Sequence, residues 1–108
     1  MNDTASSNIK CTVGLAALQQ VIDPEIGLNV VDLGLIYQIV FDEFGKKIFC
    51  TMTLTTQFCP MGESIIESVR ETLKSAFPLY DPIIKLTFDP QWDHEMISNE
   101  GRKFLNET

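Results

Sequence analysis

The fold of this chain is decided by residues 35–54, which read LIYQIVFDEFGKKIFCTMTL. Apolar residues alternate with other residues on both sides of a short connecting stretch; they are Leu35, Tyr37, Ile39 and Phe41 before it and Ile48, Cys50, Met52 and Leu54 after it. Such alternation is typical of strands with one buried face. The connecting stretch, residues 43–46, supplies a turn in which Gly45 can adopt a positive φ. The sequence therefore predicts an antiparallel hairpin.

Helical periodicity lies on both sides of the hairpin. Over residues 11–22 the apolar residues that recur at helical spacing are Leu15, Leu18, Val21 and Ile22. Pro24 ends this helix, because a proline disfavours helical dihedrals in the residue before it. A second amphipathic helix is predicted from Pro60 to Ala76. A third strand follows over residues 83–88, with an inward set of Ile84, Leu86 and Phe88.

The resulting order of elements is α-β-β-α-β. Each helix has one apolar stripe and each strand mostly one apolar face, which predicts an α+β fold of two layers: a small three-stranded sheet with both helices on one face. Residues 1–10 are predicted to be a flexible tail. Residues 11–108 are predicted to form one domain, because 108 residues with 44% hydrophobic content can bury a continuous core. The segment 90–108 is expected to fold back as a short turn or helix.

Composition restricts the classes of function. The net charge of −7 comes from 15 acidic and 8 basic residues, and it argues against nucleic acid as a partner because no basic stripe is present. The longest apolar stretches fall well short of the roughly 20 residues that cross a bilayer, so no membrane association is expected. The three cysteines form no CxxC pair, which indicates a reducing compartment; the predicted location is cytoplasmic.

Cys59 is the best candidate for chemistry. It follows the second strand, and Pro60 suits the first position of a helix, so Cys59 falls at or beside the predicted N-cap. There the positive end of the helix dipole lowers a thiol pKa and favours the thiolate as a ligand or nucleophile. The alternative is that Cys59 is a small buried hydrophobic residue. Cys50 is expected in the core, and Cys11 is expected to have no role in the chemistry.

Acidic residues gather in the loop before the hairpin. Asp23, Glu25 and Asp32 lie within ten residues, and the hairpin topology returns the end of the second strand, with Thr55 and Cys59 beyond it, toward this loop. A functional role is weighed against a simpler one, in which Asp23 and Asp32 bond their own loop backbone and Glu25 is solvated. On the functional interpretation, replacing Asp32 disturbs the site more than the fold.

Metal binding by Cys59 is favoured over covalent catalysis. A nucleophilic thiol needs a nearby base, and the one histidine, His94, lies far away in the sequence. The helix dipole and the nearby carboxylates shift the thiol pKa in opposite directions, whereas a bound cation stabilises thiolate and carboxylates together. A structural zinc site needs four ligands, which this chain does not offer. Thiolate ligation of iron remains, with further ligands from a second subunit, a partner protein or a small thiol.

Several spaced motifs, in order along the chain, resemble one known family. They are Asp23-Pro24-Glu25-Ile26, Asp32 to Tyr37, Thr55 with Cys59 to Gly62, and then Pro90, Trp92 and Ile97 to Arg102. Together they are similar to the SufT/PaaD-like family of metal-sulfur cluster biosynthesis proteins. Gln57 and Phe58 stand where relatives often have Pro and Gly. The cysteine-rich C-terminal extension usual in the PaaD branch is not seen, so the stand-alone SufT-like branch is preferred.

This resemblance implies a fold similar to the C-terminal scaffold domain of NifU and a role in assembling or delivering iron-sulfur clusters. It identifies Cys59 as the cluster-associated cysteine, so Cys59 is the predicted metal ligand. Asp23, Glu25, Asp32 and Thr55 match other signature positions and are predicted to help bind the cofactor, a transient iron-sulfur cluster or iron. The expected partners are iron-sulfur scaffold proteins and client apoproteins, with homodimer formation as a further expectation.

Three classes of function follow. A carrier binds iron or a cluster through Cys59; an adaptor links scaffold and client without holding metal; a thiol enzyme uses Cys59 as nucleophile and is disfavoured because no base is near. The accessory roles are therefore preferred over catalysis. Trp92 is expected to cover the end of the sheet, with a partner-binding anchor as the alternative.

Overall fold

The structure is a computed structural model that describes residues 2–57 and 60–107, with side chains described for 9–57 and 60–106. The elements in chain order are α1 (Asn2–Leu18), β1 (Ile36–Asp42), β2 (Lys47–Met52), α2 (Gly62–Ala76), β3 (Asp81–Leu86), the short 3-10 helix η1 (His94–Met96) and α3 (Asn99–Glu107). The predicted α-β-β-α-β order is confirmed. The C-terminal segment folds back as η1 and α3, also as predicted.

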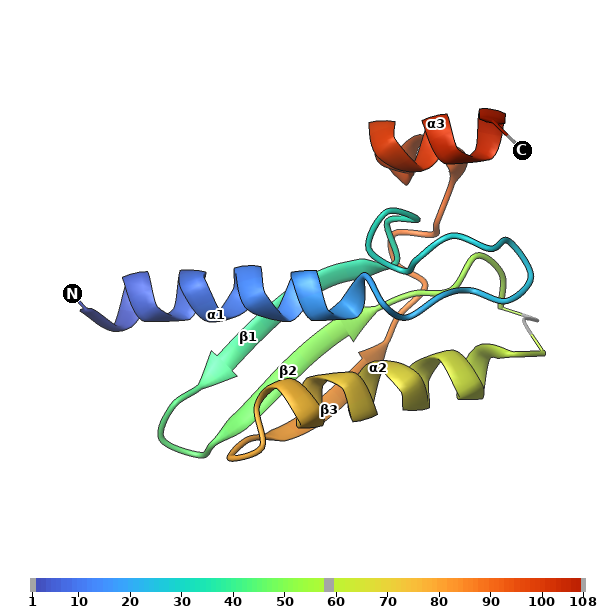
Figure 1. Cartoon of the computed structure of the whole chain (residues 1–108). Helices are drawn as coiled ribbons and strands as arrows, with labels where there is room; N and C mark the ends of the chain where they lie inside the picture. The colour runs from blue at the N-terminus through green and yellow to red at the C-terminus, as the bar shows by residue number, and fades with distance from the viewer. Residues whose placement is uncertain (1, 58–59, 108) are drawn as a thin grey trace.

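The three strands form one mixed sheet in the order β1-β2-β3. β1 and β2 pair antiparallel, with Phe41 opposite Ile48 and Ile39 opposite Cys50, so the predicted hairpin is confirmed. β3 lies parallel to β2, and the crossover that this requires is supplied by α2. Figure 1 shows α1 and α2 side by side on one face of the sheet. The fold is therefore the predicted two-layer α+β arrangement.

The core lies between the sheet and these two helices. In α2 the buried residues Ile65, Val69 and Leu73 recur every fourth position and form its inward stripe. They meet fully buried side chains from α1, the loop before β1 and the sheet, namely Leu18, Leu33, Leu35, Ile48, Cys50 and Met52. One continuous apolar cluster therefore joins the helices, the hairpin and the loop that precedes it.

The predicted start of the first helix was wrong. α1 begins at Asn2, within the segment predicted to be a tail, and ends at Leu18 rather than Ile22. Asn, Asp, Thr and Ser have low helix propensity because their side chains compete for backbone hydrogen bonds, but this preference does not forbid helical dihedrals. After Leu18 the chain leaves the helix, and Val21 remains buried while Ile22 is 49% exposed.

Three details of the sheet also differ from expectation. In the β1–β2 turn the positive φ belongs to Lys46, at 52°, and not to Gly45. A Cβ at Gly45 would lie 2.6 Å from Asp42 Oδ2, so another residue there would displace the Asp42 side chain. β3 begins at Asp81, so Pro82 lies inside it, which an edge strand tolerates. Leu86, the last residue of edge strand β3, was expected to point inward but is 41% exposed.

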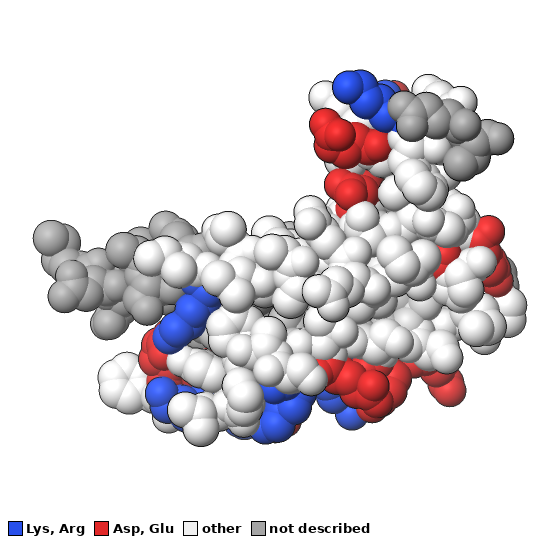
Figure 2. Space-filling view, in the orientation of Figure 1, with Lys and Arg blue, Asp and Glu red and all other residues white. Residues whose placement is uncertain are grey.

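The surface in the orientation of Figure 1 carries no broad basic area. Figure 2 shows Lys and Arg there in small groups, each beside Asp or Glu, and red patches near α2 and the loops. Among the described residues, no helix combines the length and apolar character required to span a membrane.

Candidate functional site

Three loops meet at the end of the sheet where β1 begins and β2 ends (Figure 1). The backbone N–H of Thr53, just after β2, donates to Leu35 O at 2.9 Å. The N–H of Thr87, just after β3, donates to Met52 O at 2.9 Å. These bonds bring together the loop before β1, the loop after β2 and the segment after β3, as the hairpin topology predicts.

The loop between α1 and β1, which we call the first loop, is held by the buried Asp23. It is 1% exposed, and its Oδ1 accepts a hydrogen bond from the Glu25 N–H at 2.9 Å, which makes an Asx turn around Pro24. The Asp23 carbonyl accepts from Gly27 N at 2.7 Å, and Gly27 has a φ of 82°. Glu25 itself is exposed. The Asp23 carboxylate therefore holds the loop, and Glu25 is the loop carboxylate that solvent and partners can reach.

Asp32 joins the first loop to α3. Its Oδ2 accepts from Asn29 Nδ2 at 2.7 Å, and its Oδ1 accepts from Ser98 Oγ at 2.7 Å. The Asp32 carbonyl accepts from the Ser98 N–H at 2.8 Å. Ser98 Oγ in turn accepts from the Gly101 N–H at 2.9 Å, as an N-cap residue does. These contacts indicate a structural role for Asp32.

The segment after β3 closes over the same end of the sheet. The indole N–H of Trp92 donates to Leu33 O at 2.7 Å, and the Tyr37 hydroxyl donates to Pro90 O at 2.7 Å. Trp92 is half-buried against the core, which agrees with its predicted role as a cover. Gly34, with a φ of 83°, allows a close approach, because a Cβ there would lie 2.4 Å from Met96 O.

The prediction for Cys59 lies outside the described residues, but the start of the following helix is described. α2 begins at Gly62 with Met61 as its N-cap, so the prediction of Pro60 as the first helical residue was wrong. Pro60 lies in a turn before the helix. In sequence, Cys59 therefore precedes the N-cap by two residues. Thr55, another predicted site residue, is half-buried in the loop between β2 and α2.

A small hollow joins the first loop to the start of α2. It has a volume of about 190 Å³ and is lined by Ile22, Pro24, Met61, Ser64, Ile65 and Ser68. Ile22 and Met61 stand at its rim, 49% and 38% exposed. The Asp23–Pro24 turn and the start of α2 therefore lie close together, and their shared surface mixes apolar side chains with the hydroxyls of Ser64 and Ser68.

The other two cysteines are held as neutral thiols. Burial raises the pKa of Cys50 to about 12. Burial also raises the pKa of Cys11, whose Sγ donates to Ile39 O at 3.2 Å. The described residues contain no group of three His, Cys, Asp or Glu side chains placed to hold a metal ion. Neither of these thiols is therefore suited to bind iron.

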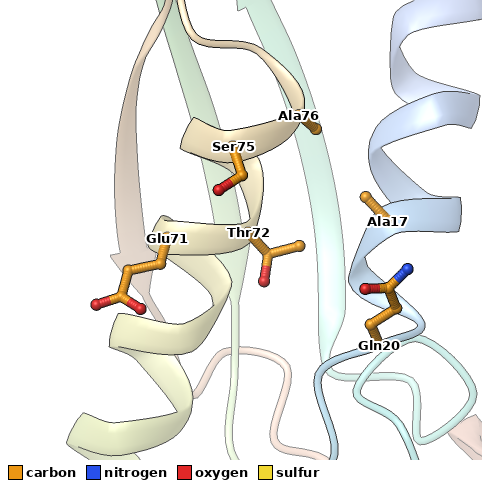
Figure 3. A pocket seen from close by; sticks show the side chains of 6 residues that line it. All are labelled: Ala17, Gln20, Glu71, Thr72, Ser75 and Ala76. Carbon is orange, nitrogen blue, oxygen red and sulfur yellow. The ribbon is translucent and has the colours of Figure 1, made fainter.

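A second hollow lies away from this end, between α1 and α2. Figure 3 shows its lining residues, Ala17 and Gln20 on α1 and Glu71, Thr72, Ser75 and Ala76 on α2. Its volume is about 460 Å³. Glu71 is the one titratable side chain in this lining, so the hollow offers no set of metal ligands and no nucleophile with a base.

Comparison with known proteins identifies the family. A family model described as an iron-sulfur cluster assembly protein matches residues 15–81. The chain belongs to this iron-sulfur cluster assembly family. The matched range contains all five predicted site residues, Asp23, Glu25, Asp32, Thr55 and Cys59, and ends before Trp92 and Ser98. The resemblance found in the sequence motifs is thereby confirmed.

Related proteins align with most of the length of this chain. A Porphyromonas gingivalis protein named Fe-S protein maturation auxiliary factor is 45% identical over 78% of this chain and 79% of its own length. The Staphylococcus aureus Fe-S protein maturation auxiliary factor SufT is 40% identical over 76% of this chain and 92% of its own length. A solved domain of unknown function from Bacillus anthracis superposes with a TM-score of 0.90 at 30% identity, covering 97% of this chain and 99% of that one.

Sequence reasoning missed the residues that hold the loops together. Asn29 and Ser98 are the partners of Asp32, and Gly34 allows the contact with Met96. Ser98 had a recognisable signal, since a serine directly before a helical segment is a common N-cap. The pairing of Asp32 with Ser98 had none, because the two residues are 66 positions apart.

Proposed function

We propose that this chain is an accessory iron-sulfur protein maturation factor that binds its cargo, iron or an iron-sulfur cluster, through Cys59 and passes it to client apoproteins. The observation that carries the proposal is the family match over residues 15–81, which spans the first loop and the segment containing Cys59. The two curated relatives described above are named as maturation auxiliary factors, which supports the same role.

The chemistry of the three thiols supports Cys59 as the ligand. Cys50 and Cys11 have raised pKa values, and a neutral thiol is a poor ligand for iron. Cys59 is the remaining cysteine in the sequence. A cluster needs more ligands than one thiolate, and the described residues supply no group of three that holds a metal. We assign the other ligands to a scaffold, a client or a small thiol, which suits cargo held only during transfer.

Contacts with partner proteins are supported by the surface beside the Cys59 segment. Ile22, Pro24 and Met61 present apolar side chains around a hollow of about 190 Å³, and Glu25 is exposed on the same loop. A surface of this kind allows a scaffold or client to dock by apolar contact, with a carboxylate at its edge. We place this exchange in the cytoplasm, where thiols stay reduced.

The test is anaerobic reconstitution of the full chain with ferrous iron and sulfide, followed by transfer to an apo-ferredoxin. Wild type, Cys59→Ala and the matched control Cys11→Ala are compared by visible absorption and by bound iron and sulfide. The proposal expects a cluster in the wild type and in Cys11→Ala, and its loss in Cys59→Ala. Equal cluster binding by Cys59→Ala would refute the role of this thiol.

An adaptor without metal is the second candidate, because docking at the hollow beside the start of α2 requires no bound iron. It predicts no cluster in any variant, together with scaffold binding that survives Cys59→Ala. A thiol enzyme has less support, because His94 is exposed on η1 and its ring lies against Trp92, with centroids 5.2 Å apart. Rapid alkylation of Cys59 at neutral pH would support a thiol enzyme.

A further inference from the structure

The face of the sheet turned away from α1 and α2 carries nine outward residues, which we call the outer face. Three come from each strand: Gln38, Val40 and Asp42 from β1, Lys47, Phe49 and Thr51 from β2, and Asp81, Ile83 and Lys85 from β3. Residues on the opposite face, such as Phe41, Ile48 and Cys50, are buried beneath the helices. The outer face is thus the side of the sheet that the helices leave uncovered (Figure 1).

An apolar row crosses the middle of the outer face. Val40 pairs with Phe49, and Phe49 pairs with Ile83, so the three side chains stand in line across the sheet. They are 44%, 40% and 36% exposed. Single exposed apolar residues are ordinary, but adjacent ones on all three strands form a continuous strip, and such a strip favours contact with another molecule.

The charges on the outer face cancel, although the chain as a whole is acidic. Asp42 and Asp81 are balanced by Lys47 and Lys85 on the nine positions, whereas the chain carries a net charge of −7. Two copies of an acidic protein repel each other over most of their surface. Here they can approach with little repulsion, so a second copy of this chain fits the face.

We propose that two copies pack their outer faces together around a two-fold axis that runs along the apolar row. This axis places Phe49 over the partner's Phe49, and the strands of the two copies run in opposite directions. The residues on one side of the apolar row therefore face the partner's residues from the other side of the row. Asp81 then faces the partner's Lys85, and Lys85 faces the partner's Asp81. Within one chain these two residues are four positions apart on β3, roughly 13 Å, which is too far to pair.

The size of the face predicts a weak dimer. The nine positions span about 10 Å across the strands and about 13 Å along them, a few hundred Å² per copy with side chains included. Stable interfaces bury about 800 Å² per partner, so we expect a dissociation constant on the order of 0.1 mM. Because the strands run in opposite directions, the two loop ends lie at opposite ends of the dimer. Each copy then keeps its own separate site.

The experiment follows the amide resonances of the full chain by NMR as the concentration rises from about 0.05 mM to about 1 mM, with sedimentation equilibrium on the same samples. Concentration-dependent shifts are expected on the nine positions of the outer face. Phe49→Asp should raise the dissociation constant on the order of a hundredfold or more. Val13→Asp is the matched control, because Val13 is a comparable apolar residue, 48% exposed on α1.

A charge exchange tests the axis without altering the apolar row. Asp81→Lys alone and Lys85→Asp alone should each weaken the dimer about tenfold, and the double variant should restore it. The dimer should also persist in Cys59→Ala, which separates this inference from the proposed function. The proposal is overturned if the chain stays monomeric at the highest concentration, if the shifts map to the loop end, or if the double variant does not recover.

Discussion

The two ends of the sheet are built in different ways. At the hairpin end, Lys10 Nζ and the Tyr80 hydroxyl both donate to Glu43, and Lys10 also donates to Tyr80 Oη at 2.9 Å. The Tyr80 ring packs edge-on against Phe41, with centroids 5.4 Å apart, and Phe77 completes the aromatic group. At the loop end, the polar contacts position loops instead, and Ile22 and Met61 stay exposed around a hollow.

The two ends of the sheet therefore contribute differently: contacts at the hairpin end stabilise the fold, and contacts at the loop end position the loops. The hairpin end joins α1, the turn and the start of β3 through one compact cluster, so substitutions there should lower stability and leave the loop end intact. The loop end is held by hydrogen bonds between segments distant in the sequence. Substitutions there should change the geometry next to Cys59, even where the loss of stability is small.

The largest expected effect is at Tyr80. Tyr80→Ala removes a ring that is 7% exposed and should lower the free energy of unfolding by about 3–5 kcal/mol. Tyr80→Phe is the control that keeps the ring and removes the hydroxyl. Urea unfolding gives the stability, and iron bound per folded chain should stay at the wild-type level. A loss of iron binding by folded Tyr80→Ala would show that the two ends are coupled.

The next effect is at Gly34, with Gly27 as its matched control. Both have a positive φ, so Gly→Ala should cost about 1–2 kcal/mol at each position. At Gly34 the new methyl also meets the Met96 carbonyl, which should add about 1–3 kcal/mol, whereas nothing lies within 4 Å at Gly27. Thermal unfolding of both variants measures the difference. Equal losses would contradict the close contact between the first loop and η1.

Asp32→Ala should cost about 1–3 kcal/mol, because Ser98 and Asn29 lose the acceptor that joins them. Hydrogen exchange should become faster at the start of α3, at Gly101 and Arg102, while α2 stays protected. Asp89→Ala, at an exposed position after β3, is the control. Unchanged exchange in α3 would argue that Asp32 serves the site rather than the fold, which is the functional interpretation of the sequence.

The smallest effect is a pH dependence at the hairpin end. Hydrogen bonds from Lys10 and Tyr80 lower the pKa of Glu43, so its contribution to stability is complete above its usual pKa and is lost as the pH falls through the lowered value. The difference in unfolding midpoint between wild type and Glu43→Gln should therefore shrink between about pH 7 and about pH 3. Glu100→Gln, on exposed α3, is the control. A difference that grows toward acid would reverse the sign of this linkage.

The hairpin, α2 and the two-layer arrangement could be predicted because each depends on a short repeat in the sequence. Alternation from Leu35 to Phe41 and a four-residue repeat from Ile65 to Leu73 identify the buried faces without knowledge of the rest of the chain. The start of α1 was missed, since propensity is a weak guide for polar residues. The site prediction brought the loops together correctly, and its simpler interpretation anticipated the bond of Asp23 to its own loop backbone. It gave no signal for the pairing of Asp32 with Ser98.

By itself, the sequence determined the elements, their order and the position of Cys59 after β2, because these follow from local periodicity and from short motifs. The tertiary structure decided how the carboxylates are placed: it buries Asp23, and it pairs Asp32 with Ser98, 66 residues away. It also aligned Val40, Phe49 and Ile83 into one row. Such contacts depend on the strand register and on the paths of loops through space, and local sequence preferences carry little information about either.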